Sequence, residues 1–211
     1  MTTQTAHLEW RYATKLFDPT QSVSDADFAL ILDAMRLAPT SFGLQPFRVV
    51  HLANRGLRER LKPLCWNQSQ ITDASHLLVI QTVTTITPEM IDDHIKRIAS
   101  VRSVPVADLE GYRGMMGGML LTHPAAKAWA QRQAYLAMGF GLEMAASLQV
   151  DTCPIEGVDT VACDALLAEA IPLDGYETVV LVAVGYRSES DKYQHAPKVR
   201  VPMTTFCVTV G

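Results

Sequence analysis

The segment Val150-Asp151-Thr152-Cys153-Pro154-Ile155-Glu156-Gly157 is the feature around which the chain is organised. It follows an apolar run, residues 134–148, in which Glu143 is the single charged residue. That run predicts a helix buried on nearly all sides. A short β-like piece then leads into Pro154, and Gly157 ends the turn. Proline fixes φ and glycine permits close backbone approach, so the turn can present N–H groups to a ligand. An ordinary helix-to-strand turn is the commoner outcome of such a local pattern.

Strands and helices alternate on either side of this segment. Residues 75–84 and 178–184 are apolar on both faces and predict central strands covered by helices. Residues 47–52 predict a third strand, and the alternation of Phe206, Val208 and Val210 predicts a terminal one. The sequence therefore predicts one α+β or α/β domain over residues 1–211, with a small sheet. Four helix starts are indicated by capping patterns, at Ser24, Asn54, Thr87 and Asp159.

Composition narrows the class of protein. Hydrophobic residues make up 48% of the chain and charged residues only 19%, which favours burial of apolar surface in an oligomer. The net charge of −4 offers no domain-wide basic field for nucleic acid or anionic membranes. No apolar run reaches the ~20 residues of a membrane span, and residues 1–7 lack a signal-peptide pattern. The four cysteines lack metal-site spacing, so reduced thiols in a cytoplasm are expected.

The usual sequence motifs of catalysis do not occur. There is no G-x-G-x-x-G after a strand, no Walker loop, no G-x-S-x-G and no H-E-x-x-H, so no Rossmann site, acyl-transfer site or metal site is expected. What remains is a set of scattered cations, amides and small-residue loops. A ligand with a phosphate and a flat hydrogen-bonding ring would use such a set, because Arg and Lys bind phosphate and side-chain amides bind a ring edge.

Five motifs in this order resemble the flavin-dependent nitroreductase family, in its oxygen-insensitive NAD(P)H nitroreductase / dihydropteridine reductase branch. The resemblance covers about residues 9–203. The motifs are Arg11-Tyr12-Ala13-Thr14-Lys15-Leu16-Phe17, Ala38-Pro39-Thr40-Ser41-x-x-x-Gln45-Pro46-Phe47, Asp73-Ala74-Ser75-His76, Pro154-Ile155-Glu156-Gly157 and Pro197-Lys198-x-Arg200-x-Pro202.

The resemblance implies the family's three-layer α-β-α fold, with a C-terminal strand that extends to the partner subunit. It also implies FMN at the interface of an obligate homodimer. Arg11, Lys198 and Arg200 match phosphate-binding positions, and the backbone N–H of Glu156 or Gly157 matches the contact to flavin N5. The implied flavin-binding set is Arg11, Tyr12, Ala13, Thr14, Lys15, Pro39, Thr40, Ser41, Asn67, Gln70, Pro154, Ile155, Glu156, Gly157, Lys198 and Arg200.

Single positions in that set carry distinct implied roles. Lys15 matches the cation at the N1/O2 side of the ring, where it would stabilise the reduced flavin. Asn67 matches the residue that binds the pyrimidine edge. Pro39, Thr40 and Ser41 match a segment supplied by the other subunit.

The implied activity is a two-step reaction at one face of FMN. NAD(P)H delivers hydride to flavin N5 and leaves, and a nitroaromatic, quinone or related acceptor then takes two electrons. No side chain is required as an acid or base, because the flavin carries the chemistry. The residues that match the substrate side are Phe42, Trp66, Met115 and Met116.

Departures from the family pattern leave other activities open. Gln70 stands where a second Lys is common, so reduced flavin should be stabilised less. Tyr12 and Ala13 replace His and Ser, and Met115-Met116 replaces bulky aromatic residues, which predicts a more adaptable pocket. The alternatives are ene or dihydropteridine reduction, flavin destruction, a low-turnover FMN-binding protein and a structural dimer without a ligand.

Overall fold

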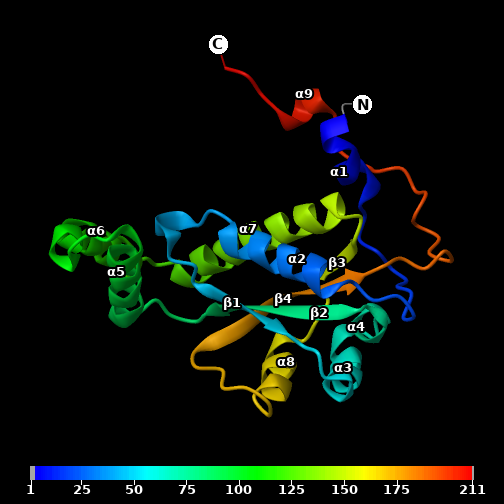
Figure 1. Ribbon diagram of the computed structural model, residues 1–211, viewed down its shortest axis with the longest axis horizontal. Helices are drawn as coiled ribbons and strands as arrows, with labels where there is room; N and C mark the ends of the chain where they lie inside the picture. The colour runs from blue at the N-terminus through cyan, green and yellow to red at the C-terminus, as the bar shows by residue number, and fades with distance from the viewer. Residues whose placement is uncertain (1–2, 211) are drawn as a thin grey trace.

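A four-stranded antiparallel sheet forms the centre of the computed structural model, which describes residues 3–210 (Figure 1). The two middle strands are buried along most of their length, as their continuous apolar sequences predict. Two edge strands flank them in the order β1-β2-β4-β3. The strands are β1 (Phe47–His51), β2 (His76–Val83), β3 (Asp151–Ile155) and β4 (Tyr176–Gly185).

Helices cover both faces of this sheet. On one face, α2 (Asp25–Leu37) and α7 (Ala126–Ser147) pack against Leu78 and Ile80. On the other face, Leu77 and Val79 pack against the layer of short helices. Successive residues of β2 therefore point into opposite layers. The three-layer α-β-α arrangement is confirmed, and the second helical layer consists of α3 (Arg55–Leu61), η3 (Lys62–Cys65), α4 (Gln70–Asp73) and α8 (Thr160–Leu167).

Side-chain caps start the helices where the sequence indicates them. Ser24 accepts a hydrogen bond from the backbone of Asp27 at 3.0 Å, and Asn54 accepts one from Leu57 at 3.1 Å. Thr87 and Asp159 cap α5 and α8 in the same way. Each cap satisfies an N–H group that the helix itself leaves unpaired. The remaining elements are η1 (Thr3–Thr5), α1 (Ala6–Trp10), η2 (Ser41–Gly43), α5 (Pro88–Arg102), η4 (Val106–Leu109), α6 (Glu110–Leu120) and α9 (Met203–Phe206).

A separate pair of helices, α5 and α6, projects from one end of the sheet (Figure 1). Glycines weaken the intrinsic helicity of α6, yet residues 110–120 are helical. Tertiary burial outweighs that cost, since Met116 and Leu120 lie in an apolar cluster with Ile91 and Ile95 of α5.

The prediction that residues 134–148 form a helix buried on nearly all sides is wrong for the single chain. Leu136 and Phe140 of α7 are 47% and 44% exposed. The sheet and α2 cover one side of α7, and α1 contacts α7 near Glu143, whereas Leu136 and Phe140 remain uncovered among residues 3–210. Apolar side chains on an uncovered helix face are typical of an interface.

The terminal strand expected at Phe206, Val208 and Val210 does not form in the single chain. Residues 203–206 make a short helix, and residues 207–210 have no assigned structure. This segment projects away from the sheet, and the three side chains are 74%, 80% and 90% exposed (Figure 1). A strand needs a neighbour for its hydrogen bonds, and no strand lies beside the tail in the described chain.

No helix within residues 3–210 combines the length and the apolar character needed to cross a membrane.

Candidate functional site

The turn after β3 exposes backbone donors at the edge of the sheet. The carbonyl of Thr152 accepts a hydrogen bond from the N–H of Thr14 at 3.2 Å, so Thr152 directs its backbone groups away from β4. Strand alternation gives Pro154 and Glu156 the same outward direction. Pro154 has no N–H. The N–H groups of Glu156 and Gly157 donate to no acceptor within residues 3–210. Glu156 is therefore the first residue at this edge that can donate to a bound molecule.

Gly157 is required at this turn by a close contact with Trp66. A Cβ at position 157 would lie 2.7 Å and 2.8 Å from two ring carbons of Trp66. Gln68 donates to the carbonyl of Gly157 at 3.1 Å. Trp66 and Asn67 both have φ near +55°, a conformation that costs energy outside glycine and often marks functional sites. The polar segment after residue 65 and the β3 turn thus form one surface.

The segment from Arg11 to Phe17 lies along the outer edge of β3. The hydroxyl of Thr14 donates to Asp151 at 3.1 Å. The N–H groups of Lys15 and Leu16 donate to one carboxylate oxygen of Asp191, at 2.7 Å and 3.0 Å. Burial alone would raise the pKa of Asp191, but hydrogen bonds from backbone N–H groups, Lys15 among them, lower it. Asp191 therefore fixes the backbone from which Lys15 extends.

Three cations gather at the start of this segment. Lys198 donates to the carbonyl of Arg11. Burial lowers the pKa of Arg11, and the charge of Arg200 lowers it further. Burial, Arg11 and Arg200 also lower the pKa of Lys198. None of the three cations forms an ion pair within the described chain, and the buried Nε of Arg11 has no hydrogen-bond partner there. Glu9 acts on Lys198 and Asp151 acts on Arg11 in the opposite direction, but neither acid forms a salt bridge with the cluster in the described chain. Mutual repulsion without a salt bridge indicates a site for a multiply charged anion.

Asp151, the nearest buried acid, is already neutralised by Arg187. Two guanidinium nitrogens of Arg187 contact Asp151 at 2.6 Å and 2.9 Å. The same guanidinium lies over the rings of Trp10 and Tyr12, with its carbon 4.1 Å and 4.7 Å from the ring centroids. Asp151 is therefore not the partner of the three-cation cluster. This buried ion pair holds the N-terminal segment against β3.

Lys15 and Gln70 both influence the thiol of Cys153 in β3. Burial raises the pKa of the Cys153 thiol, whereas Lys15, a hydrogen bond with Gln70 and Arg11 act to lower it. Gln70 is only 5% exposed. Two residues that the resemblance places near a flavin ring, Lys15 and Gln70, thus both influence Cys153 of β3.

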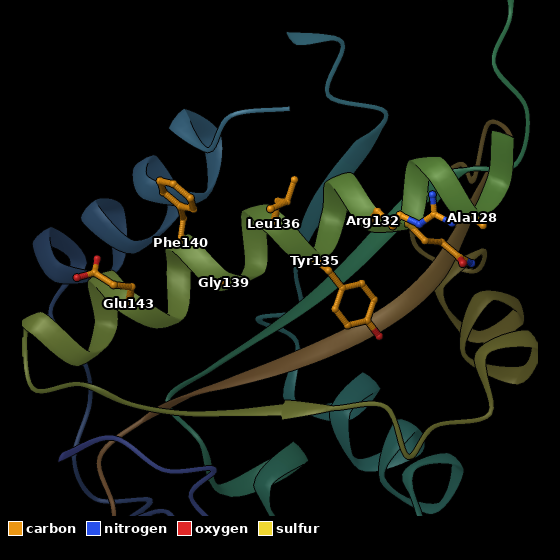
Figure 2. A pocket seen from close by; sticks show the side chains of 8 residues that line it. Ala128, Arg132, Tyr135, Leu136, Gly139, Phe140 and Glu143 are labelled. Atoms are coloured by element: carbon orange, nitrogen blue, oxygen red, sulfur yellow. The ribbon is translucent and has the colours of Figure 1, made fainter. Parts of the chain in front are cut away.

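The Pro39–Ser41 motif lies on the other flank of α7. The N–H of Ser41 donates to the buried side chain of Gln133 at 2.9 Å. Two residues further along α7, the hydroxyl of Tyr135 donates to the carboxylate of Glu156 at 2.5 Å. Figure 2 shows Tyr135 on one side of α7 and Leu136 and Phe140 directed to another. A single chain thus contains two half-sites separated by the thickness of α7.

The predicted substrate-side residues are divided in the same way. Trp66 contacts Gly157 at the β3 turn. Phe42 and Met115 belong to the other half-site, and Met115 is 49% exposed. Met116 is fully buried in the α5–α6 cluster, so it faces no ligand in this conformation. Of the two methionines predicted at a substrate surface, only Met115 is therefore accessible in this conformation.

Comparison with known proteins is decisive for the family. The sequence profile described as "Nitroreductase family" matches residues 8–186. This chain belongs to the nitroreductase family. A Bacillus subtilis protein named "Putative NAD(P)H nitroreductase YfkO" is 36% identical over 189 residues, which cover 84% of this nitroreductase and 86% of that protein. A Haemophilus influenzae protein described as "Putative NAD(P)H nitroreductase" is 33% identical, with 84% of each chain covered.

Solved structures confirm the nitroreductase fold. A nitroreductase-like protein of Streptococcus mutans superposes with a TM-score of 0.83 at 19% identity, covering 99% of this chain and 98% of the other. A protein of Exiguobacterium sibiricum, whose crystal structure is a complex with FMN, superposes with a TM-score of 0.82 at 20% identity. That superposition covers 100% of this chain and 98% of the other.

Several residues that shape the site of this nitroreductase were not identified from sequence. Asp191 and Gln68 lie in irregular segments, and neither has a motif of its own. Tyr135 and Gln133 lie in or beside the long apolar run, and that sequence context predicts only that they are buried in a helix. Their roles depend on contacts more than 15 residues away in the chain, and local patterning carries no information on such contacts.

Proposed function

We propose that this nitroreductase is a homodimeric, FMN-dependent oxidoreductase. It uses NAD(P)H to reduce nitroaromatics, quinones or related acceptors by two electrons. The observation that carries the proposal is the convergence, on the outer edge of β3, of an unpaired three-cation cluster and the unpaired N–H groups of Glu156 and Gly157. The relatives named for NAD(P)H and the structural neighbour in complex with FMN support the choice of cofactors.

The cation cluster fits a phosphate group. Arg11, Lys198 and Arg200 repel one another without forming a salt bridge in the described chain, and the buried Nε of Arg11 needs an acceptor. A phosphate would supply two negative charges and several acceptor oxygens at this position. In the proposed complex these residues hold the FMN phosphate, and Tyr12, Ala13 and Thr14 line the path from the phosphate toward the ring.

The β3 turn and its neighbours fit the flavin ring. FMN, when bound, accepts hydride from NAD(P)H and passes two electrons to the acceptor. The backbone N–H of Glu156 is proposed to donate to flavin N5, and Lys15 to supply positive charge near N1. Asn67 is proposed to offer its amide to the pyrimidine edge, and Gln70 to lie near the ring in place of a second Lys. Trp66 and Pro154 border the turn, and no side chain is required to transfer a proton.

A second copy of the chain is proposed to complete the site. The outer face of α7 holds a groove of about 1050 Å³, lined by Leu136, Phe140 and six neighbours (Figure 2). Twofold pairing across this face would bring the Pro39–Ser41 segment of each chain to the β3 turn of the other. The exposed tail with Phe206, Val208 and Val210 is proposed to reach the partner subunit as a strand.

The four cysteines form no disulfide with one another, which fits a reducing cytoplasm.

The visible spectrum under anaerobic conditions tests the proposal. Purified protein should be yellow and should lose its flavin absorbance when NADH or NADPH is added. Addition of a quinone or a nitroaromatic should then restore the absorbance. Bleaching without recovery by any nitroaromatic or quinone, but with recovery by an enone or a pteridine, would favour the alternative reductases. A yellow protein that neither dinucleotide bleaches would contradict the proposed activity. A colourless protein that ignores added FMN would contradict the cofactor as well.

A further inference from the structure

The loop between α2 and β1 has an unusual backbone. Phe42, Gly43 and Gln45 have φ values of 60°, 71° and 52°. Two of these residues are not glycine, and a left-handed conformation at a bulky residue such as Phe42 is strained. Such residues persist where the surroundings hold them in place, and they concentrate at functional sites.

Two side chains from the projecting helices hold Phe42 in this conformation. Nε2 of His94, in α5, donates to the carbonyl of Phe42 at 2.9 Å. The hydroxyl of Tyr112, in α6, donates to the same carbonyl at 3.1 Å. Both lone pairs of one loop carbonyl are thus used by side chains that lie more than 50 residues away. We call His94, Tyr112 and Phe42 the Phe42 clamp.

The chemistry of His94 does not match that of a filler residue in an apolar core. The side chain is buried at 7% exposure, and its Nδ1 has no partner within residues 3–210. Burial lowers the pKa of His94, the hydrogen bond to Phe42 opposes this in part, and Arg97 and Arg102 lower the pKa further, so the net direction favours the neutral ring. A neutral ring must carry its proton on Nε2 to bond a carbonyl. A leucine would fill this space without a buried unpaired nitrogen, so the donor to Phe42 is the distinguishing property of the residue.

The clamp also determines where α6 lies relative to the loop. The rings of Phe42 and Tyr112 are 6.1 Å apart between centroids and tilted by 58°. Met115 follows Tyr112 by three residues in α6, so both lie on neighbouring positions of one helix face. Phe42 and Met115 are the two residues of this half-site that the family resemblance matches to the substrate side. Their separation therefore depends on the two bonds to one carbonyl.

We propose that His94 and Tyr112 are positioning residues that set the width of the acceptor pocket through Phe42. The inference rests on the proposed function, and it takes Phe42 to lie at the acceptor side, as the family resemblance implies. Neither residue contacts the β3 turn, the cation cluster or Lys15 in the described structure. Loss of the clamp should therefore change which acceptors fit, while FMN binding and flavin reduction at saturating NAD(P)H continue.

Steady-state kinetics with quinones of increasing size test the clamp. The measured quantity is the ratio of kcat/KM for a three-ring quinone to kcat/KM for benzoquinone. Tyr112→Phe keeps the ring and removes one donor, so Phe42 can retract. The ratio should rise about fivefold, the effect of one lost hydrogen bond. His94→Leu should act in the same direction, and His94→Gln, which keeps an N–H donor, should restore most of the original ratio.

Matched measurements separate a positioning role from general damage. Asp93→Asn, on the exposed side of α5 beside His94, should leave the ratio unchanged. FMN affinity and the anaerobic rate of flavin reduction should stay within about twofold in all variants. Tyr112→Phe keeps the inference testable if His94→Leu does not fold. An unchanged ratio in Tyr112→Phe, in an enzyme that NAD(P)H reduces, would overturn the inference alone. A wild-type protein that NAD(P)H does not reduce would contradict the proposed function, and the inference with it.

Discussion

Gly157 illustrates how one residue can constrain two motifs. Its missing Cβ allows Trp66 to lie against the β3 turn, while Gln68 holds its carbonyl. The neighbouring Glu156 acts at the same place in a different way. Its carboxylate accepts a hydrogen bond from Tyr135 of α7. Burial, and then this hydrogen bond, raise the pKa of Tyr135 to about 12. The side chain of Glu156 is therefore occupied by α7, and its backbone N–H faces the proposed ligand.

A first prediction compares Gly157→Ala with Glu156→Gln. The alanine Cβ would displace the Trp66 ring and rotate the turn, so the rate of flavin reduction by NAD(P)H should fall about tenfold, as expected for loss of a strong hydrogen bond. Because Trp66 is 77% exposed, thermal stability should change little. Glu156→Gln keeps an acceptor oxygen for Tyr135 and should change the rate less than threefold. Loss of activity in Glu156→Gln with FMN still bound would show that the side chain, and not the backbone, carries the role of this residue.

A second prediction concerns the charge near Lys15. Gln70 is buried beside Cys153, whose thiol also responds to the charge of Lys15. Gln70→Lys would add a cation there and should raise the two-electron reduction potential of bound FMN by about 30 mV, equivalent to ~1.4 kcal/mol. Redox titration measures the change, with Gln70→Met as a neutral control. If the potential of Gln70→Lys does not exceed that of the control, this position does not act through electrostatics.

At the scale of elements, α7 connects the two half-sites. Gln133 holds the Ser41 loop on one flank and Tyr135 holds the β3 turn on the other. Between these flanks, Leu136 and Phe140 remain half-exposed. The long apolar sequence of α7 is thus explained by one buried flank in the chain and a second face available to another copy.

A third prediction follows from that face. Leu136→Asp with Phe140→Asp should convert a dimer to a monomer in sedimentation experiments, since each burial is worth about 1.5–3 kcal/mol and occurs twice in a symmetric interface. FMN should be lost together with the dimer, because each site would lack the partner's Pro39–Ser41 segment. Val101→Asp, at an exposed position of α5, is the control and should remain dimeric. A double variant that stays dimeric would place the interface elsewhere.

At the scale of the whole molecule, the protonation of three histidines is linked to folding, and of these His94 is buried, His76 is half-buried and His51 is exposed. Burial lowers the pKa of His51, His76 and His94 below the ordinary value of 6.5. Nδ1 of His76 lies 3.1 Å from Nε2 of His51, and the ring of His76 stacks on Phe28 at 3.9 Å. The folded chain therefore favours the neutral form of each imidazole more than the unfolded chain does.

A fourth prediction is a loss of stability on mild acidification. The unfolded chain binds protons at these histidines below about pH 6.5, whereas the folded chain binds them only at lower pH. Stability should be constant above that pH and should fall as pH decreases to 5. Urea midpoints measured with saturating FMN report the change. The double variant His51→Gln and His76→Gln should show a shallower decline, and an equal decline would exclude this pair as a source.

The sequence by itself determined the layers of this protein. Continuous apolar runs specified β2 and β4, caps at Ser24, Asn54, Thr87 and Asp159 specified helix starts, and five ordered motifs specified the family. Those properties depend on hydrophobic period and on local hydrogen bonds, which are readable within a few residues. The helical conformation of the glycine-rich α6 and the exposure of one face of α7 depend instead on which elements pack against each other in the fold.

Only the tertiary structure decided which motifs share a site. Asp191 fixes the backbone of Lys15, and Gln68 fixes Gly157, through bonds between segments 176 and 89 residues apart. The same packing separates Ser41 from the β3 turn by the thickness of α7, and it buries Met116 while leaving Met115 exposed. Such contacts form when distant elements bury a common core. Their partners are set by chain topology, which a local pattern does not encode.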